Sequence, residues 1–442
     1  MYLNRKIDAA LVEWAEDPHH KPLLMRGARQ VGKTTAVRNL AKRFKTYVEI
    51  DLEADEEVCK CINRSFDINA LVALIEIRYG KRIIPGETLL FFDEIQSCPR
   101  AIMALRYFYE KRQSLHVVAA GSLLEFALQE VGDIPIGRVR NIYVYPFSFA
   151  EFVDAVGGGI VLEHARYAES GGETSEAVHR KLLEYLKSFL IVGGMPAAVL
   201  AYVESKSYIA ARNEHRDIMQ NLKEDFAKYK TRIDPAVLRS TLKSVINQTG
   251  AQFTFSNSLL ELTYAKAKNC TDLMERAKII VRIDCTRANG IPLGGDINPK
   301  DNKFMFFDTG LYLYETGLDL ADWIGDEPTK FVNRGALAEM FVAHELKKAG
   351  SPLDDNQLYY WHRDGKDCRA EVDYVVQYRN EPLPIEVKSG KSGSMHSLHL
   401  LMKEKNLRLG VRTSEENFGS LENGTIRILP LYSIGEFAAI LK

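Results

Sequence analysis

Apolar residues in the first third of the chain form short, nearly continuous runs separated by amphipathic segments. Such runs predict buried strands of a parallel sheet, and the segments between them predict helices on both of its faces. The expected strands are Pro22–Arg26, Tyr47–Ile50, Leu89–Phe92, Val117–Ala120 and Ile142–Tyr145. We therefore predict an α/β domain with a parallel sheet over residues 1–155.

The pattern becomes mostly helical after two loop-like stretches, Gly157–Gly159 and Ser170–Ser175. Helical periodicity covers residues 181–191, 208–229, 235–245 and 259–281, with a break or cap at 269–272. Residues 278–283 and 303–307 resemble two short strands around a polar loop. Helices followed by a β-ribbon suggest a winged-helix-like region, which we assign to residues 156–330.

The last part of the chain, residues 331–442, has an α/β pattern. An amphipathic helix is expected over residues 336–348, and strands over 358–361, 371–378 and 383–388, with a turn at 379–381. At 442 residues the chain is long enough for about three domains.

Composition and charge restrict the classes of partner. The chain is 46 % hydrophobic and 26 % charged, as in ordinary globular proteins, and its net charge is −1. Any DNA binding must therefore come from a local cluster in the middle domain, for which the candidates are Lys266, Lys268, Arg276, Lys278, Arg282 and Arg287. The alternative is a winged helix that serves only to pack domains together.

The cysteines and the apolar runs bear on location. Cys59, Cys61, Cys98, Cys270, Cys285 and Cys368 form no C-x-x-C pair, which suits a reducing cytoplasm and provides no zinc framework. The N-terminus does not resemble a signal peptide, and the longest apolar run, Phe189–Tyr202, is too short to span a bilayer. We expect a cytoplasmic protein that does not enter membranes.

A G-x-x-x-x-G-K-T phosphate-binding loop follows the first predicted strand. Gly27 and Gly32 allow a tight turn with inward-pointing N–H groups, Lys33 places a charge at the β- and γ-phosphates, and Thr34 can ligate Mg²⁺. The next residues have helical spacing, so the phosphates would lie at a helix N-terminus. We assign nucleotide binding to Gly27, Ala28, Arg29, Gln30, Val31, Gly32, Lys33, Thr34 and Thr35.

Two carboxylates end the strand Leu89–Phe92. Asp93 would hold Mg²⁺, and Glu94 would orient the attacking water as the catalytic base. The alternative is a core strand followed by two acids in a solvated loop. Ser122, after the strand Val117–Ala120, could sense the γ-phosphate or merely cap a helix.

These motifs together resemble AAA-type ATPases of the subgroup with an added catalytic glutamate. The chain looks most like prokaryotic ATP-binding proteins that join such an ATPase to a C-terminal domain of unknown function. The matching stretches are 26–35, 92–96, 121–122, 137–138, 145–152, 193–196, 308–311 and 335–339. The resemblance implies Mg·ATP as the ligand and makes Arg138 a candidate contact for the transition-state phosphate. The alternative for Arg138 is a surface ion pair.

A second candidate site lies in the C-terminal domain. Glu386 and Lys388 are two residues apart on a predicted strand and share one face, and Asp373 opens the neighbouring strand. With Glu339 on the preceding helix they resemble the PD-(D/E)xK nuclease core, although Val372 replaces the usual proline. That resemblance implies bound Mg²⁺ and metal-dependent cleavage. The alternative is a structural ion-pair cluster that binds no metal.

Three hypotheses follow for function. The first is a Mg²⁺-dependent ATPase that acts as a nucleotide-driven switch on its C-terminal domains, possible partners being DNA or another protein. The second is an ATP-regulated, metal-dependent DNA nuclease. The third is a non-catalytic, nucleotide-gated protein-interaction module. Self-association into an oligomer is compatible with all three.

Overall fold

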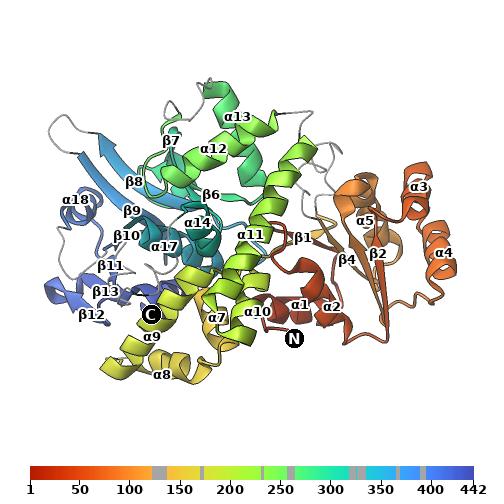
Figure 1. Ribbon diagram of the computed structural model, residues 1–442, viewed down its shortest axis with the longest axis horizontal. Helices are drawn as coiled ribbons and strands as arrows, with labels where there is room; N and C mark the ends of the chain where they lie inside the picture. The colour runs from red at the N-terminus through yellow and green to blue at the C-terminus, as the bar shows by residue number, and fades with distance from the viewer. Residues whose placement is uncertain are drawn as a thin grey trace. The chain divides into compact units, whose positions relative to one another are not determined.

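The computed structural model describes residues 1–121, 137–169, 174–229, 233–255, 264–317, 325, 335–364, 369–388 and 395–442 (Figure 1). The chain divides into two compact units. The first consists of Met1–Pro146, Arg276–Lys278 and Ser351–Asp355, and the second of Phe147–Glu275, Ile279–Gly350 and Asn356–Lys442.

The first unit is built on a five-stranded sheet with the order β2-β3-β4-β1-β5, in which all pairs are parallel. Its strands are β1 (Leu23–Arg26), β2 (Thr46–Asp51), β3 (Thr88–Asp93), β4 (His116–Ala120) and β5 (Arg140–Tyr143). Each overlaps a predicted strand, so the prediction of a parallel α/β domain is confirmed. The apolar runs identified these strands because both faces of the sheet are covered.

Five helices surround this sheet: α1 (Lys6–Glu16), α2 (Lys33–Ala41), α3 (Glu56–Arg64), α4 (Ile68–Tyr79) and α5 (Arg100–Lys111). The last three share one apolar core with β2, β3 and β4, whereas α1 packs against α2. Since neighbouring parallel strands end at the same edge, the segments after β1, β3 and β4 meet there.

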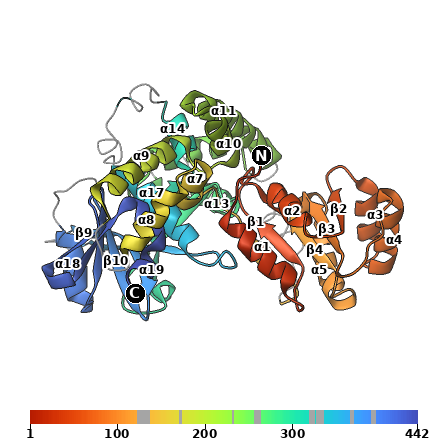
Figure 2. The same cartoon turned by 90° about the horizontal axis from the view of Figure 1, so that it is seen from below.

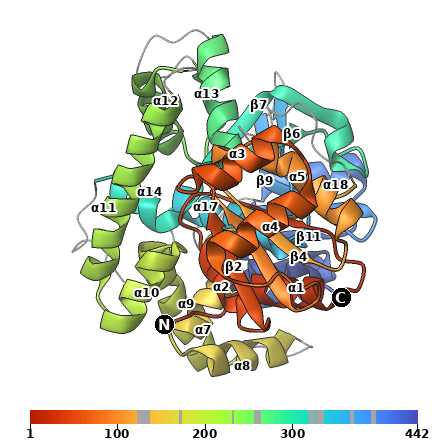
Figure 3. The same ribbon diagram turned by 90° about the vertical axis from the view of Figure 1, so that its right-hand side faces the viewer.

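The second unit begins with helices. They are α7 (Phe149–Ala155), α8 (Gly159–Glu169), α9 (Glu176–Val192), α10 (Pro196–Ser205), α11 (Tyr208–Asp225), α12 (Pro235–Asn247), α13 (Tyr264–Arg276) and α14 (Thr309–Glu315). α10 and α11 lie side by side (Figure 3). The expected helices at 181–191, 208–229 and 235–245 correspond to α9, α11 and α12. The start of the one expected at 259–281 lies outside the described residues. Its remainder is α13, which continues through the break expected at 269–272 and ends at Arg276, so that break was wrong.

The stretch Gly193–Pro196 and the stretch Asp308–Leu311 are joined by one carboxylate. Asp308 accepts hydrogen bonds from the backbone N–H of Gly194 at 2.7 Å and of Leu311 at 3.0 Å. Gly193 has φ +70°, and a Cβ there would lie 2.3 Å from Asp308 Oδ1. Two motifs far apart in sequence therefore have a structural role at the junction of α9, α10 and α14.

The rest of the second unit is an eight-stranded mixed sheet with the order β12-β13-β11-β10-β9-β8-β6-β7. Its strands are β6 (Ile280–Thr286), β7 (Ile297–Phe306), β8 (Leu358–Asp364), β9 (Arg369–Tyr378), β10 (Glu381–Val387), β11 (Gly410–Ser414), β12 (Gly419–Leu421) and β13 (Ile426–Pro430). The helices α17 (Gly335–Ala349), α18 (His396–Lys405) and α19 (Phe437–Ile440) accompany it. α18 packs against β9 and β10 (Figure 2).

The β-ribbon that we assigned to a winged-helix-like region has a different setting. β6 and β7 form an antiparallel pair, but β6 also pairs in parallel with β8, in the register Ile283 to Leu358. The ribbon is thus the edge of the large sheet and not a separate wing. Local periodicity could not reveal this, because the partner strand β8 is more than 70 residues further along the chain. The division between residues 156–330 and 331–442 remains a prediction; apart from Arg276–Lys278 and Ser351–Asp355, both parts belong to the second compact unit.

None of the helices in the described ranges is both long enough and apolar enough to cross a bilayer.

Candidate functional site

The phosphate-binding loop connects β1 to α2. Gly27 has φ +145°, and a Cβ there would lie 2.1 Å from the carbonyl oxygen of Val144, so a larger residue would clash with backbone. Gly32, the N-cap of α2, adopts a left-handed conformation with φ +93°. Among the described residues no side chain caps α2. Its first N–H groups are therefore available to an anion.

Lys33 lies within this loop. Its Nζ donates hydrogen bonds to the carbonyl oxygens of Gly27 at 2.9 Å and Ala28 at 2.7 Å, and the residue is only 8 % exposed. Burial lowers the pKa of Lys33 to about 8, against the opposing effect of Glu94 and Asp93, whose charges favour the ammonium. A phosphate would replace these two carbonyls as the partner of the ammonium.

Asp93 and Thr34 come together at the end of β3. The Thr34 hydroxyl donates to Asp93 Oδ2 at 2.7 Å. The pKa of Asp93 is raised by burial, although the Thr34 hydroxyl and the N–H of Glu94 partly offset this. A hydroxyl and a carboxylate beside a phosphate loop are the hard oxygen ligands that Mg²⁺ prefers, so these two residues fit the metal of Mg·ATP.

Glu94 follows Asp93 directly, in a left-handed backbone conformation (φ 48°, ψ 43°) that is uncommon for a glutamate. Its carboxylate accepts a hydrogen bond from the side-chain amide of Gln96. Gly121, which follows β4, leaves room for that amide, because a Cβ there would lie 2.2 Å from Gln96 Oε1. Gln96 thus holds the expected base in place. The sequence motif contained it, but only the structure indicates this role.

The two remaining predicted residues of the ATPase site differ in outcome. Ser122 lies outside the described residues. The Arg138 guanidinium lies 3.6 Å from a Glu110 carboxylate oxygen on α5, and its side chain is 48 % exposed. It therefore takes part in a surface ion pair in this structure, and a role in contacting phosphate stays a prediction.

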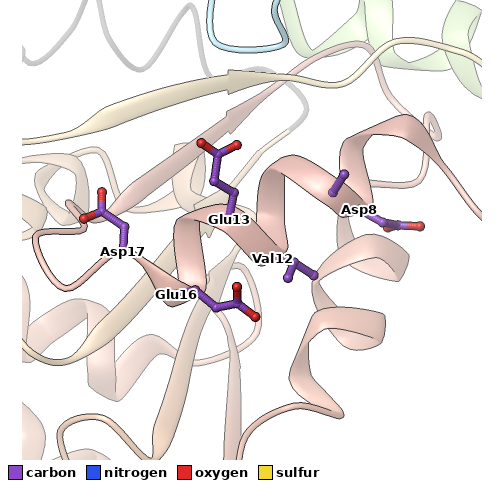
Figure 4. Close-up of a pocket in the computed structure, with 6 residues that line it drawn as sticks. Asp8, Val12, Glu13, Glu16 and Asp17 are labelled. Atoms are coloured by element: carbon purple, nitrogen blue, oxygen red, sulfur yellow. The ribbon is translucent and has the colours of Figure 1, made fainter.

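A surface hollow of about 640 Å³ lies along α1 (Figure 4). Its lining includes the carboxylates of Asp8, Glu13, Glu16 and Asp17. Such an acidic lining would repel phosphates, so this hollow plays no part in the nucleotide site.

Comparisons with known proteins identify the first unit. Residues 19–153 match a family described as an AAA domain. The N-terminal region thus matches the domain type found in AAA-type ATPases. ATP is therefore the nucleotide expected in the loop just described. Residues 183–322 and 334–434 match two families described as domains of unknown function (DUF8612 and DUF4143).

Solved structures are similar only at a distance. A Walker-type ATPase of Pyrococcus abyssi is 13 % identical with a TM-score of 0.45; the match covers 71 % of this chain and 95 % of that one. The Aeropyrum pernix Orc1 protein in complex with DNA is 14 % identical with a TM-score of 0.30; the match covers 73 % of this chain and 94 % of that one. AMPPCP-bound DnaA from Aquifex aeolicus is 13 % identical with a TM-score of 0.28; the match covers 62 % of this chain and 86 % of that one. A search of curated proteins finds no significant match.

The four residues of the second candidate site interact with one another. The Val387 N–H donates to Asp373 Oδ2 at 2.8 Å, and Lys388 Nζ donates to Glu386 Oε1 at 2.6 Å. Burial, and next the charge of Asp373, raise the pKa of Glu339 to about 8 and that of Glu386 to about 7. Helix α17 and strands β9 and β10 thus place three carboxyl groups within electrostatic reach of one another.

The structure adds residues to this cluster that the sequence did not indicate. Lys303 of β7 is 1 % exposed; its Nζ forms an ion pair with Glu371 and lies 3.7 Å from Glu339 Oε2. The same ammonium lies 5.2 Å from the centre of the Tyr360 ring. Although burial alone would lower the pKa of Lys303, the surrounding carboxylates raise it above its usual range. A charged lysine therefore occupies the middle of the cluster.

In the described part of the chain, no group of three or more His, Cys, Asp or Glu side chains is arranged to hold a metal ion. The ion pairs of Lys303 with Glu371 and Glu339 are the contacts expected of the alternative that we gave for the cluster, an ion-pair network.

Two of the six basic residues considered for DNA binding form ion pairs with acids. Lys278 forms an ion pair with Asp355 at 2.7 Å, and Arg282 with Asp284 at 2.7 Å. Lys266 and Lys268 are exposed on α13. The structure thus leaves a smaller positive patch than the sequence suggested.

Proposed function

We propose that the first unit hydrolyses ATP with the help of Mg²⁺. The observation that carries this proposal is the hydrogen bond between Thr34 and Asp93, which brings the loop hydroxyl and the strand-end carboxylate together beside Lys33 and Glu94. Lys33 and the first N–H groups of α2 would bind the phosphates. Bound Mg²⁺ would neutralise charge on the β- and γ-phosphate oxygens.

Hydrolysis requires a group that orients water, and we assign this task to Glu94. Its carboxylate follows the Mg²⁺-binding Asp93 and is fixed by Gln96. Glu94 would accept a hydrogen bond from the attacking water and take its proton as the new P–O bond forms. Gln96 acts through Glu94 and is a positioning residue.

We infer further that ATP binding and release act as a switch on the C-terminal part of the chain. Arg5 donates to the carbonyl oxygen of Val31 in the loop at 3.2 Å and to that of Tyr145 at 2.7 Å. The Tyr145 hydroxyl donates to Asp355 at 3.2 Å, and Asp355 also pairs with Lys278. All five residues belong to the first unit.

The chain itself connects the end of this series of hydrogen bonds to the large sheet. Lys278 comes just before β6, and Asp355 three residues before β8. These two strands are neighbours in the large sheet. A change in the loop on ATP binding or release would therefore act on the segments that lead into both strands.

No second activity is proposed for the carboxylate cluster around Asp373. Lys303 supplies positive charge that a metal would otherwise bring, so the cluster is accounted for without nuclease activity. DNA binding through Lys266 and Lys268 remains a hypothesis. An interaction module without hydrolysis is the alternative that the next experiment excludes or supports.

The decisive experiment measures phosphate release and ATP binding for Glu94→Gln. The amide keeps shape but removes the charge that activates water, so we expect turnover to fall on the order of 100-fold while ATP still binds. Glu53→Gln, an exposed acid after β2, is the matched control and should behave as wild type. Unchanged turnover in Glu94→Gln would show that the base is misassigned. No hydrolysis by wild type would favour the module.

A further inference from the structure

Aromatic rings and cations alternate on one surface of the first unit, where α3, α4 and α5 contact one another (Figure 3). Arg100 is the first residue of α5, and its guanidinium carbon lies 4.5 Å from the centre of the Phe66 ring. Phe66 lies between α3 and α4, and its ring stacks on that of Tyr107 of α5, with centroids 4.9 Å apart and planes at 18°. The Lys111 ammonium, one turn further along α5, lies 5.7 Å from the centre of the Tyr107 ring. The four side chains thus form one continuous row.

Two more guanidinium groups belong to the same surface. That of Arg106 lies 5.9 Å from the centre of the Tyr107 ring. Arg106 and Arg138 both pair with the carboxylate of Glu110, at 2.9 and 3.6 Å. We call this set the α5 surface, and it lies within the first unit; its members are Phe66, Arg100, Arg106, Tyr107, Lys111 and Arg138.

The cations of the α5 surface outnumber the acids that flank them. In the described part of the chain, neither Arg100 nor Lys111 forms an ion pair. The acids next to these residues in the chain are Glu110, which two arginines share, and Asp67, the N-cap of α4. All four cations are exposed, and an exposed ion pair contributes at most about 1 kcal/mol. A polyanion can therefore take the place of Glu110 at little cost.

The rings give this surface a second property besides charge. Phe66 and Tyr107 are half-buried and pack against the apolar core that α3, α4 and α5 share with the sheet, so their positions are fixed. Arg100 is exposed and lies over the Phe66 ring, which supports a flat cationic group at the surface. Nucleobases stack on aromatic rings and on arginine planes of this kind.

We propose that the α5 surface binds single-stranded nucleic acid. Phosphates would contact the exposed cations, and a base would stack on Arg100. A single strand offers phosphates and unpaired bases together, whereas a duplex covers its base faces and an acidic peptide has no bases. Binding needs neither ATP nor hydrolysis, so this proposal is independent of the proposed function. It also differs from DNA binding through Lys266 and Lys268, which belong to the second unit.

Fluorescence anisotropy of the full chain, without nucleotide, tests the proposal. The probes are labelled oligothymidylate and oligouridylate of about 20 nucleotides, and a labelled polyglutamate peptide. We expect micromolar binding of at least one oligonucleotide, with a logarithmic salt slope of about −0.7 for each phosphate contacted. Tighter binding of polyglutamate than of either oligonucleotide would assign the surface to an acidic protein segment and overturn the proposal.

Two variants separate stacking from charge. Arg100→Lys keeps the charge but loses the plane, so affinity should fall about 5-fold with an unchanged salt slope. Arg100→Glu combined with Lys111→Glu should lower affinity at least about 10-fold and reduce the slope by about 1.4. The matched control, Lys42→Glu with Lys45→Glu, reverses two exposed lysines between α2 and β2 and should bind as wild type.

Circular dichroism checks that each variant is folded, and Arg100→Lys decides alone if the double reversal disturbs the fold. Absence of oligonucleotide binding by the wild type would overturn the proposal. Equal affinity of the wild type and the Arg100 variants would do the same, because binding would then lie elsewhere on the chain.

Discussion

Replacement of Lys33 by alanine should weaken ATP binding by about 2 kcal/mol, or roughly 30-fold. One unit charge about 4 Å from a phosphate charge is worth about 4 kcal/mol at an effective dielectric constant of about 20. In the structure the ammonium donates hydrogen bonds to the carbonyl oxygens of Gly27 and Ala28. Giving up those two hydrogen bonds costs about 1 kcal/mol each, so the net contribution of Lys33 to ATP binding is about 2 kcal/mol.

Calorimetric titration with Mg²⁺ and a non-hydrolysable ATP analogue measures this loss. Lys42→Ala is the matched control, because Lys42 ends the same helix but its Nζ contacts Asn39 at 3.0 Å on the surface. It should bind the analogue as wild type does. Equal affinity for wild type and Lys33→Ala, with a native circular-dichroism spectrum for both, would refute the placement of Lys33 at the phosphates.

The same residue predicts a pH dependence. With a pKa of about 8 in the free protein, Lys33 is mostly charged at pH 7 and mostly neutral at pH 9. Since phosphates favour the charged form, binding takes up a proton above pH 8, and affinity should fall there by a factor that approaches about ten per pH unit. Lys33→Ala should show no such slope between pH 8 and 9.5. A parallel slope in the variant would assign the titration to another group.

Three further predictions test other parts of the structure. His116 has a pKa of about 4 in the folded protein, because burial and the neighbouring His20 disfavour its charged form. In the unfolded chain the pKa of this histidine is about 6.5. Unfolding free energy should therefore fall by up to about 3 kcal/mol as pH drops from 6.5 to 4, and His116→Phe should lessen this loss in urea titrations. Lys303→Met leaves buried carboxylates without their cation and should cost about 3 kcal/mol, seen as a lower melting temperature; exposed Lys300→Met on the same strand should not. If the protein binds DNA, charge reversal of Lys266 and Lys268 should weaken binding and reduce its salt dependence in shift assays, and unchanged binding would reject this patch.

The sequence by itself determined the ATPase domain. Five apolar runs gave five parallel strands, because a strand buried on both faces needs apolar side chains at nearly every position. The loop Gly27–Thr34 and the pair Asp93–Glu94 were recognisable because their chemistry depends on residues adjacent in the chain. Their convergence follows from the rule that parallel strands end at one edge of the sheet.

The tertiary structure alone decided the contacts between distant segments. Pairing of β6 with β8 turned an expected wing into a sheet edge, and it placed Lys303 among carboxylates from α17 and β9. The role of Gln96 beside Glu94 likewise depends on packing, because Gly121 after β4 leaves room for its side-chain amide. Periodicity shows which face of an element is buried, but not against which partner or in which register. That choice is made by the sum of burial, backbone hydrogen bonding and charge compensation over the whole fold.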